Sequence, residues 1–239
     1  MKLDILAFGA HPDDVELSAG GTLAKHAALG YKTGIVDLTQ GELGTRGSGP
    51  LRLKEAHAAA QILGVDIREN LGLPDGFFEL DEENIRAVIR MIRKYRPRIV
   101  LANALSDRHP DHGRGAELLK RAFFLSGLPK IKTYDEEGEE QEAFRPSRLL
   151  HYIQFVEMKP DLVVDISGYL EKKMESVMAY RSQFYDPNSD EPETLISGSG
   201  FLEDLRGRAS KLGLMIGQKH GEGFVADQTI GVFELKSVF

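Results

Sequence analysis

The segment LDILAFGAHPDD, residues 3–14, changes from apolar to polar within a few positions. Leu3 to Phe8 form a short apolar run of the kind that predicts a buried β-strand. The hexapeptide Gly9-Ala10-His11-Pro12-Asp13-Asp14 follows this strand directly. In α/β folds the carboxyl end of a strand is where ligands bind. The imidazole and the two carboxylates are therefore expected at a functional edge of a sheet.

Apolar runs and helix-period stretches alternate through the first half of the chain. Further strands are predicted at Lys32–Leu38 and Ile99–Ala102, and helices at Thr22–Leu29, Leu51–Leu63 and Asp81–Tyr95. The last helix has the clearest pattern, because Ile85, Val88, Ile89 and Ile92 share one face and Asp81 can cap its start. Strands that alternate with helices predict a doubly wound, mostly parallel sheet of the α/β class.

The second half of the chain is less regular. Residues 131–147 are polar and acidic, which favours an exposed loop or hairpin, and residues 186–200 are rich in Pro, Ser and Gly, which favours a long loop. Strands are predicted at Leu149–Val156 and Leu162–Ile166, and a helix at Tyr169–Tyr180. The simplest organisation is one domain over residues 1–239 with an elaborated C-terminal region.

Composition excludes several classes of function. The net charge is −7 and no long basic run occurs, so nucleic-acid binding is disfavoured. The chain has no cysteine, so any metal must be held by His, Asp or Glu. No apolar run is long enough for a transmembrane helix, and the N-terminal residues do not resemble a signal peptide. A cytoplasmic enzyme without a membrane partner is expected.

The first motif, residues 9–14, suits a divalent cation. Imidazole combined with carboxylate favours zinc, with iron or manganese as alternatives, and Pro12 stiffens the turn. Asp and Pro are also ordinary cap and turn residues, so this motif alone leaves metal binding open. A dinucleotide loop is disfavoured because the glycine spacing is absent and two carboxylates would repel a pyrophosphate.

A second motif, His109-Pro110-Asp111-His112, follows the predicted strand Ile99–Ala102 and repeats the chemistry of the first. If both motifs lie on neighbouring strand-to-helix loops, their side chains meet in space. Three protein ligands would then leave an open position, which is typical of a catalytic rather than a structural zinc. Clusters of Asp and His also serve two-metal phosphoesterases, so that class remains an alternative.

Together the two motifs resemble those of the PIG-L/LmbE-like zinc N-deacetylases, and the resemblance extends over most of the chain. Residues 7–64, including Gly41-Glu42, look especially like the bacillithiol-pathway deacetylases, which act on N-acetylglucosaminyl-malate. The resemblance implies a Rossmann-like fold, one zinc ion per chain, and hydrolysis of an N-acetyl sugar to acetate and the free amino sugar. A deacetylase of another N-acetyl sugar, such as diacetylchitobiose, is the nearest alternative.

The resemblance also implies roles for the side chains of both motifs. The zinc ligands of the family correspond to His11, Asp14 and His112. Its general base corresponds to Asp13, and its oxyanion-stabilising imidazole corresponds to His109, with Asp111 as the orienting partner of that imidazole. Spacing alone does not distinguish Asp13 from Asp14, or His109 from His112.

Three further residues are candidates for substrate binding. Glu42 follows the second predicted strand and could accept hydrogen bonds from sugar hydroxyls. Arg52 and Arg108 could each bind the carboxylate of a malate group bidentately, and the resemblance favours Arg52. For each of them an ordinary surface charge is the alternative. The resemblance also suggests a homo-oligomer, with a hexamer as the candidate form.

Overall fold

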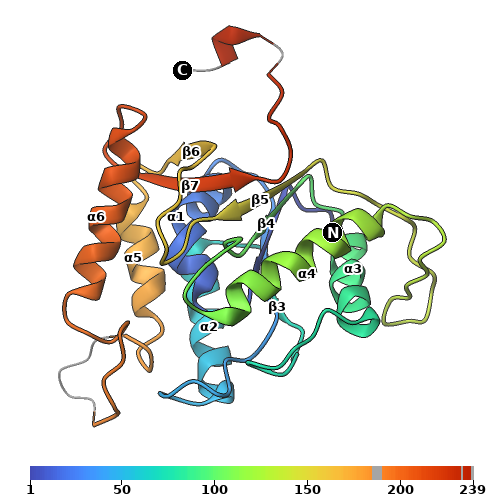
Figure 1. The fold of residues 1–239 in the computed structure, drawn as a ribbon, viewed down its shortest axis with the longest axis horizontal. Helices are drawn as coiled ribbons and strands as arrows, with labels where there is room; N and C mark the ends of the chain where they lie inside the picture. The colour runs from blue at the N-terminus through green and yellow to red at the C-terminus, as the bar shows by residue number, and fades with distance from the viewer. Residues whose placement is uncertain (185–189, 233, 238–239) are drawn as a thin grey trace.

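Among residues 1–184, 190–232 and 234–237, which the computed structural model describes, seven strands form one sheet in the order β3-β2-β1-β4-β5-β7-β6 (Figure 1). The strands are β1 (Ile5–Gly9), β2 (Thr33–Asp37), β3 (Ile67–Asn70), β4 (Ile99–Ala102), β5 (Arg148–Tyr152), β6 (Leu162–Asp165) and β7 (Gly221–Ala226). The helices are α1 (Asp14–Ala28), α2 (Gly49–Leu63), α3 (Glu82–Tyr95), α4 (Pro110–Ser126), α5 (Leu170–Met178) and α6 (Phe201–Leu214), and a 3₁₀ turn spans Leu235–Ser237.

Strand β1 lies at the centre of this arrangement. It pairs in parallel with β2 on one side and with β4 on the other, and β5 continues the parallel series beyond β4. Only β7 and β6, at the far edge, run antiparallel to their neighbours. The chain winds outward from β1 to β3 and then crosses back to β4, so the order reverses between β1 and β4. The carboxyl ends of two such strands border the ligand-binding crevice of doubly wound folds. The Rossmann-like α/β class is confirmed.

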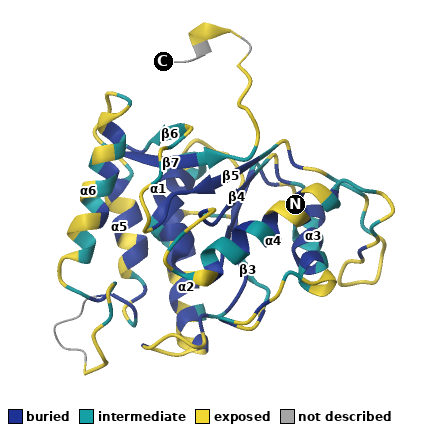
Figure 2. Cartoon of the chain, viewed as in Figure 1, coloured by how far each residue is buried: buried dark blue, intermediate teal, exposed yellow. Residues whose placement is uncertain are grey.

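The alternation of side chains along β1 divides the core into two layers. Leu6 and Phe8 point to the face that α3 and α4 cover, whereas Ile5 and Ala7 point to the face that α1 covers. Figure 2 shows that the central strands and α1 are largely buried. A third apolar cluster joins α2, α5 and α6 and closes the C-terminal third against the first half of the chain.

Helix α1 begins at Asp14, well before the expected start at Thr22. Two consecutive glycines obscured the helical pattern because glycine lowers helix propensity. The structure explains Gly21, where an added Cβ would lie 2.7 Å from Cδ1 of Ile166. Close packing against the segment after β6 therefore requires glycine at that position.

Other differences from the expected elements have local reasons. Strand β5 ends at Tyr152 instead of Val156, and the chain then turns toward the carboxyl end of β4. Strand β3 was missed because three of its four residues are polar, and α4 was missed because the second motif forms its first turn.

Tyr134 and Glu140 form an antiparallel bridge, in agreement with a small hairpin in residues 131–147. Residues 186–189 of the expected long loop lie outside the described residues. Within the described ranges, no helix combines the length and the apolar character that a membrane crossing requires.

Candidate functional site

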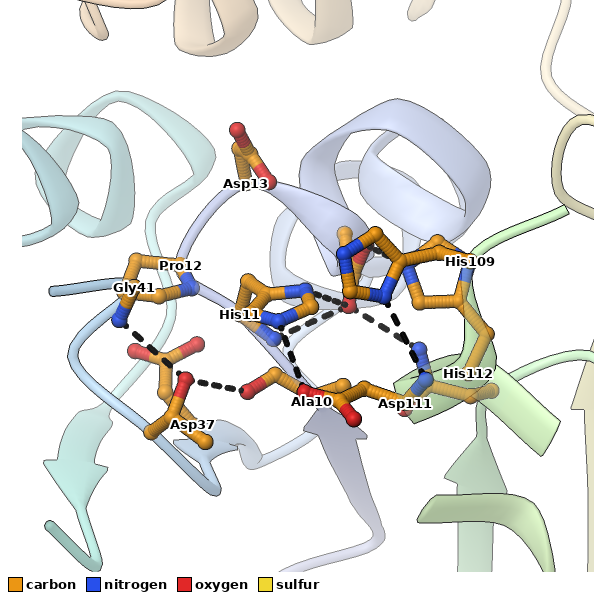
Figure 3. Close-up of polar contacts among 12 residues, drawn as sticks. Ala10, His11, Pro12, Asp13, Asp37, Gly41, His109, Asp111 and His112 are labelled. Atoms are coloured by element: carbon orange, nitrogen blue, oxygen red, sulfur yellow. Dashed lines mark hydrogen bonds and ion pairs between the residues drawn. The ribbon is translucent and has the colours of Figure 1, made fainter. Parts of the chain in front are cut away.

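The two histidine motifs meet at the carboxyl ends of β1 and β4. His11 follows β1, while His109 caps α4 and His112 lies in its first turn. The ring centroid of His11 lies 4.6 Å from that of His109 and 5.7 Å from that of His112. Figure 3 shows the three imidazoles turned toward one another, with Asp13 and Asp111 on opposite sides of His11. The predicted convergence of the two motifs is confirmed.

Asp14 completes a set of donors between the two motifs. Its Oδ1 lies 3.1 Å from Nε2 of His112, and its Oδ2 lies 3.7 Å from Nδ1 of His11. The side chains of Asn103 and Gln154 each donate a hydrogen bond of 3.0 Å to the same carboxylate. Ligand atoms of His11, His109 and His112 lie within 4.8 Å of one another, and so do those of His11, Asp75 and Asp111. Imidazoles and carboxylates at such separations fit a divalent cation. The site is thus able to hold a metal ion, as the sequence predicts.

The outward nitrogens of two imidazoles are held by carboxylates, and the sequence did not indicate two of these, Asp75 and Asp107. Nδ1 of His112 lies 2.5 Å from Asp107, and Nε2 of His11 lies 2.9 Å from Asp75 and 3.3 Å from Asp111. Such partners fix the orientation of metal-binding histidines and make the inward nitrogen a better ligand. Asp107 stands two residues before the second motif and could have been noticed, whereas Asp75 follows the missed strand β3.

Asp111 does not orient His109 through its carboxylate, contrary to the expectation from sequence. Its backbone N–H donates to Nδ1 of His109 over 3.3 Å, so His109 caps the start of α4. The carboxylate instead faces His11 and accepts hydrogen bonds from Gly76 and Arg114, each over 2.8 Å. The helical turn that begins at Pro110 directs the Asp111 side chain toward β1. Burial lowers the pKa of His109, and the neighbouring His11 and His112 lower it further.

Contacts within the cluster shift the pKa values of His11, His112 and Asp14. Burial acts to lower the pKa of His11, but its bonds to Asp111 and Asp75 and the charge of Asp14 outweigh this and raise the pKa to about 10. Burial also opposes protonation of His112, yet Asp14 and Asp107 raise its pKa to about 9. Burial disfavours ionised Asp14, but His112 and His11 hold its pKa well below its usual range. The site therefore favours positive charge between these side chains.

Asp13 has a different environment from Asp14, although the two are adjacent. Its φ of 113° is unusual for a residue other than glycine, and its Oδ2 accepts a hydrogen bond of 3.0 Å from Arg52. The strained turn directs the two carboxylates to different partners. Burial raises the pKa of Asp13 to about 7, although Arg52 opposes the increase and Asp14 adds to it.

Arg52 supports this turn and also lines the pocket over the histidines, so its contact with a substrate carboxylate stays a prediction. Its guanidinium also donates to the carbonyl oxygens of Pro12 and Gly41, and the residue is only 5% exposed. Gly41 adopts a φ of 65°, and any Cβ there would collide with the guanidinium. This close approach explains the glycine before Glu42 and assigns Arg52 to the support of Asp13.

The remaining candidates for substrate binding lie in different places. Arg108 lines the pocket that opens over the histidines, whereas Glu42 lies outside the described lining of that pocket. The Glu42 carboxylate accepts hydrogen bonds from the backbone N–H groups of Gln40 and Asp75. Glu42 thus connects the loops after β2 and β3, because its side chain turns back onto the backbone. Helix α6 adds a wall that sequence analysis did not predict, with Phe201, Leu205 and Arg208.

A buried ion cluster supports α1 close to Asp13 and Asp14. The guanidinium of Arg68 on β3 pairs with Asp37 at the end of β2, over 2.8 Å, and with Glu16 on α1. Tyr180 donates a hydrogen bond of 2.9 Å to Glu16. All three charged side chains are at most 3% exposed. Burial raises the pKa of Asp37 to about 6, against the lowering effect of Arg68.

The chain is similar to several proteins of known activity. A family model described as PIG-L, GlcNAc-PI de-N-acetylase, matches residues 6–123, which include both motifs. Diacetylchitobiose deacetylase of Thermococcus kodakarensis is 30% identical over 75% of this chain and 70% of the relative. A probable N-acetyl-alpha-D-glucosaminyl L-malate deacetylase 2 of Bacillus cereus is 26% identical over 77% of this chain and 84% of the relative.

The chain is also similar to a protein of known crystal structure and to a hydratase. The crystal structure of a conserved protein from Thermus thermophilus has a TM-score of 0.83 and 36% identity, over 97% of this chain and 98% of that one. The 4-oxalmesaconate hydratase of Pseudomonas putida is 28% identical over 74% of this chain and 73% of the relative. Similarity at this level therefore includes a hydratase as well as deacetylases.

Proposed function

Because this chain belongs to the PIG-L family of de-N-acetylases, we propose that it hydrolyses the N-acetyl group of an amino sugar with the help of a bound zinc ion. The observation that carries the proposal is the convergence of His11, Asp14 and His112, with Asp13 and His109 beside them in one pocket. The products are acetate and the free amine. Water supplies the hydroxyl group of the acetate and the proton of the amine.

We propose His11, Asp14 and His112 as the metal ligands. The carboxylates on the outward nitrogens of His11 and His112 support this choice over His109, whose Nδ1 accepts a backbone N–H instead. Imidazole and carboxylate ligands without thiolates suit zinc, and one ion per chain is expected. When bound, such an ion would lower the pKa of a water molecule and polarise the acetyl carbonyl.

The protein's own groups would handle the protons and the developing charge. Asp13, held by Arg52, is proposed to accept a proton from the attacking water and to deliver it to the leaving nitrogen. His109 accepts a hydrogen bond at Nδ1, so its neutral ring carries a proton on Nε2 and can donate it to the developing oxyanion. Asp111 supports His11 in this scheme, and its backbone positions His109.

For the substrate we propose N-acetylglucosaminyl-malate. The similarity to the probable malate-conjugate deacetylase of Bacillus cereus supports this choice, and Arg108 at the pocket wall suits a carboxylate. The similarity to diacetylchitobiose deacetylase makes that disaccharide the alternative sugar. A cytoplasmic location and a homo-oligomer, with a hexamer as the candidate form, stay predictions.

Acetate release from N-acetylglucosaminyl-malate tests this function directly. The purified protein, loaded with zinc, is expected to release acetate, and a chelator should abolish the release until zinc is restored, because the reaction depends on the bound ion. Diacetylchitobiose, 4-oxalmesaconate and a phosphate monoester are assayed in parallel. Hydration of 4-oxalmesaconate or phosphate release without any acetate would overturn the proposal, and turnover of diacetylchitobiose alone would change its substrate.

Asp75→Asn is expected to weaken zinc binding by about 10–100-fold, because the carboxylate on Nε2 of His11 makes that imidazole a better ligand. Competition with a chromophoric chelator measures the affinity without any assay of turnover. Asp81→Asn is the matched control, since Asp81 caps α3 and asparagine caps equally well. An unchanged zinc affinity in Asp75→Asn would show that Asp75 does not support the ligand.

A further inference from the structure

Besides Arg52, two arginines line the pocket. Arg108 comes from the loop between β4 and α4, and Arg208 comes from α6, a hundred residues later. The guanidinium carbon of Arg108 lies 5.3 Å from the ring centroid of Phe155, and Nη1 of Arg208 donates to the carbonyl oxygen of Gln154. Consecutive residues after β5 therefore hold both groups at the pocket.

Neither guanidinium has an ion-pair partner among the described residues, although the protein is acidic overall. Arg208 is half-buried, and burial lowers its pKa despite the more distant Asp107, Glu157 and Asp204. Arg206, two positions earlier on α6, pairs through both of its terminal nitrogens with Glu171. A partly buried cation without a counter-ion costs free energy that an anionic ligand would offset.

The surface beside these two cations is apolar. Leu17, Ile196, Phe201 and Leu205 line the same pocket and limit access of water to the half-buried Arg208, whereas Arg108 is exposed. Charge-assisted hydrogen bonds are stronger where water is excluded. The histidines and the two arginines line one pocket, so one substrate can contact both sets of side chains.

We infer that Arg108 and Arg208 together bind a carboxylate on the group attached to the amino sugar, and that Arg208 decides the preference for anionic substrates. This inference rests on the proposed function and extends it, because it assigns substrate selection to the C-terminal helix α6. Each guanidinium can direct two N–H donors at one carboxylate. A neutral group in the same place would leave both cations without a partner.

The test compares Arg208→Gln with Arg206→Gln on two substrates, N-acetylglucosaminyl-malate and neutral methyl N-acetylglucosaminide. In Arg208→Gln the KM for the malate conjugate is expected to rise by about 10–100-fold, the usual worth of hydrogen bonds to a charged group, with little change for the neutral sugar. Arg206→Gln should match the wild type on both substrates. Thermal unfolding of both variants checks that the fold is retained.

The outcomes separate this inference from the proposed function. If the wild type releases acetate from neither sugar and not from diacetylchitobiose, the deacetylase proposal itself fails. If it releases acetate but Arg208→Gln loses activity equally on both substrates, or on neither, Arg208 does not select for charge and the inference is overturned. Arg208→Lys keeps the charge but not the planar fork, and its KM for the malate conjugate should fall between wild type and Arg208→Gln.

Discussion

Asp13→Asn is expected to lower kcat by about 10²–10⁴ while the protein still binds one zinc ion. The carboxylate is the only part of the side chain that changes, and Asp13 is not one of the proposed ligands. Asparagine is also among the residues that best tolerate a positive φ, so the strained turn at 113° should persist. Steady-state kinetics together with metal analysis of the same sample measure both properties.

A control must distinguish loss of the general base in Asp13→Asn from disruption of the metal site. Asp81→Asn makes the same chemical change at the exposed start of α3 and should leave both kcat and zinc content unaltered. An Asp13→Asn enzyme that keeps more than about a tenth of the wild-type kcat would exclude Asp13 as the base, given the usual contribution of such a group. Loss of zinc in this variant would instead point to a ligand role.

Arg68→Met is expected to destabilise the fold by about 3–5 kcal/mol, the usual cost when one partner of a buried ion pair is removed. The substitution leaves the carboxylates of Glu16 and Asp37 in the core without their cation. Urea unfolding measures the change in free energy. The matched control is Arg121→Met, because Arg121 forms an exposed pair with Glu117 within one helix and should contribute about 0.3–0.5 kcal/mol.

The effect of Arg68→Met should also depend on pH. The pKa of Asp37 is raised to about 6, so its protonated form is favoured in the folded protein. The stability that this group contributes is present below the pKa of about 4 in an unfolded chain and is lost as the pH rises through about 6. Without Arg68 the loss becomes larger, so the destabilisation should increase from pH 5 to pH 8. A loss below about 1 kcal/mol at pH 8 would contradict the assigned role of this cluster.

The general arrangement of the site could be predicted because it depends on short-range patterns. Each motif follows an apolar run that forms a parallel strand, and carboxyl ends of parallel strands lie along one edge. The meeting of residues 9–14 and 109–112 depends in addition on the pairing of β1 with β4, which the structure shows. Prediction was poorer where elements carried few apolar residues, as in β3, or depended on packing, as at Gly21 of α1.

Roles that depend on the direction of a side chain could not be predicted in the same way. Asp111 faces His11 instead of His109, Arg52 turns toward Asp13, and Glu42 turns back onto backbone N–H groups. In each case the partner comes from another loop, and its position is decided by how α2, α4 and the strands pack. Sequence spacing contains no measure of such distances.

Sequence alone determined the fold class, the pair of motifs and the side chains able to hold a cation, because strand periodicity and ligand chemistry are local properties. Tertiary structure alone decided which carboxylates support His11 and His112 and brought Arg208 to the same pocket. Asp75 lies 64 positions from His11 in the chain, and Arg208 lies 54 positions from Gln154. Contacts over such separations form only when the helices pack on the sheet, since no local preference encodes them.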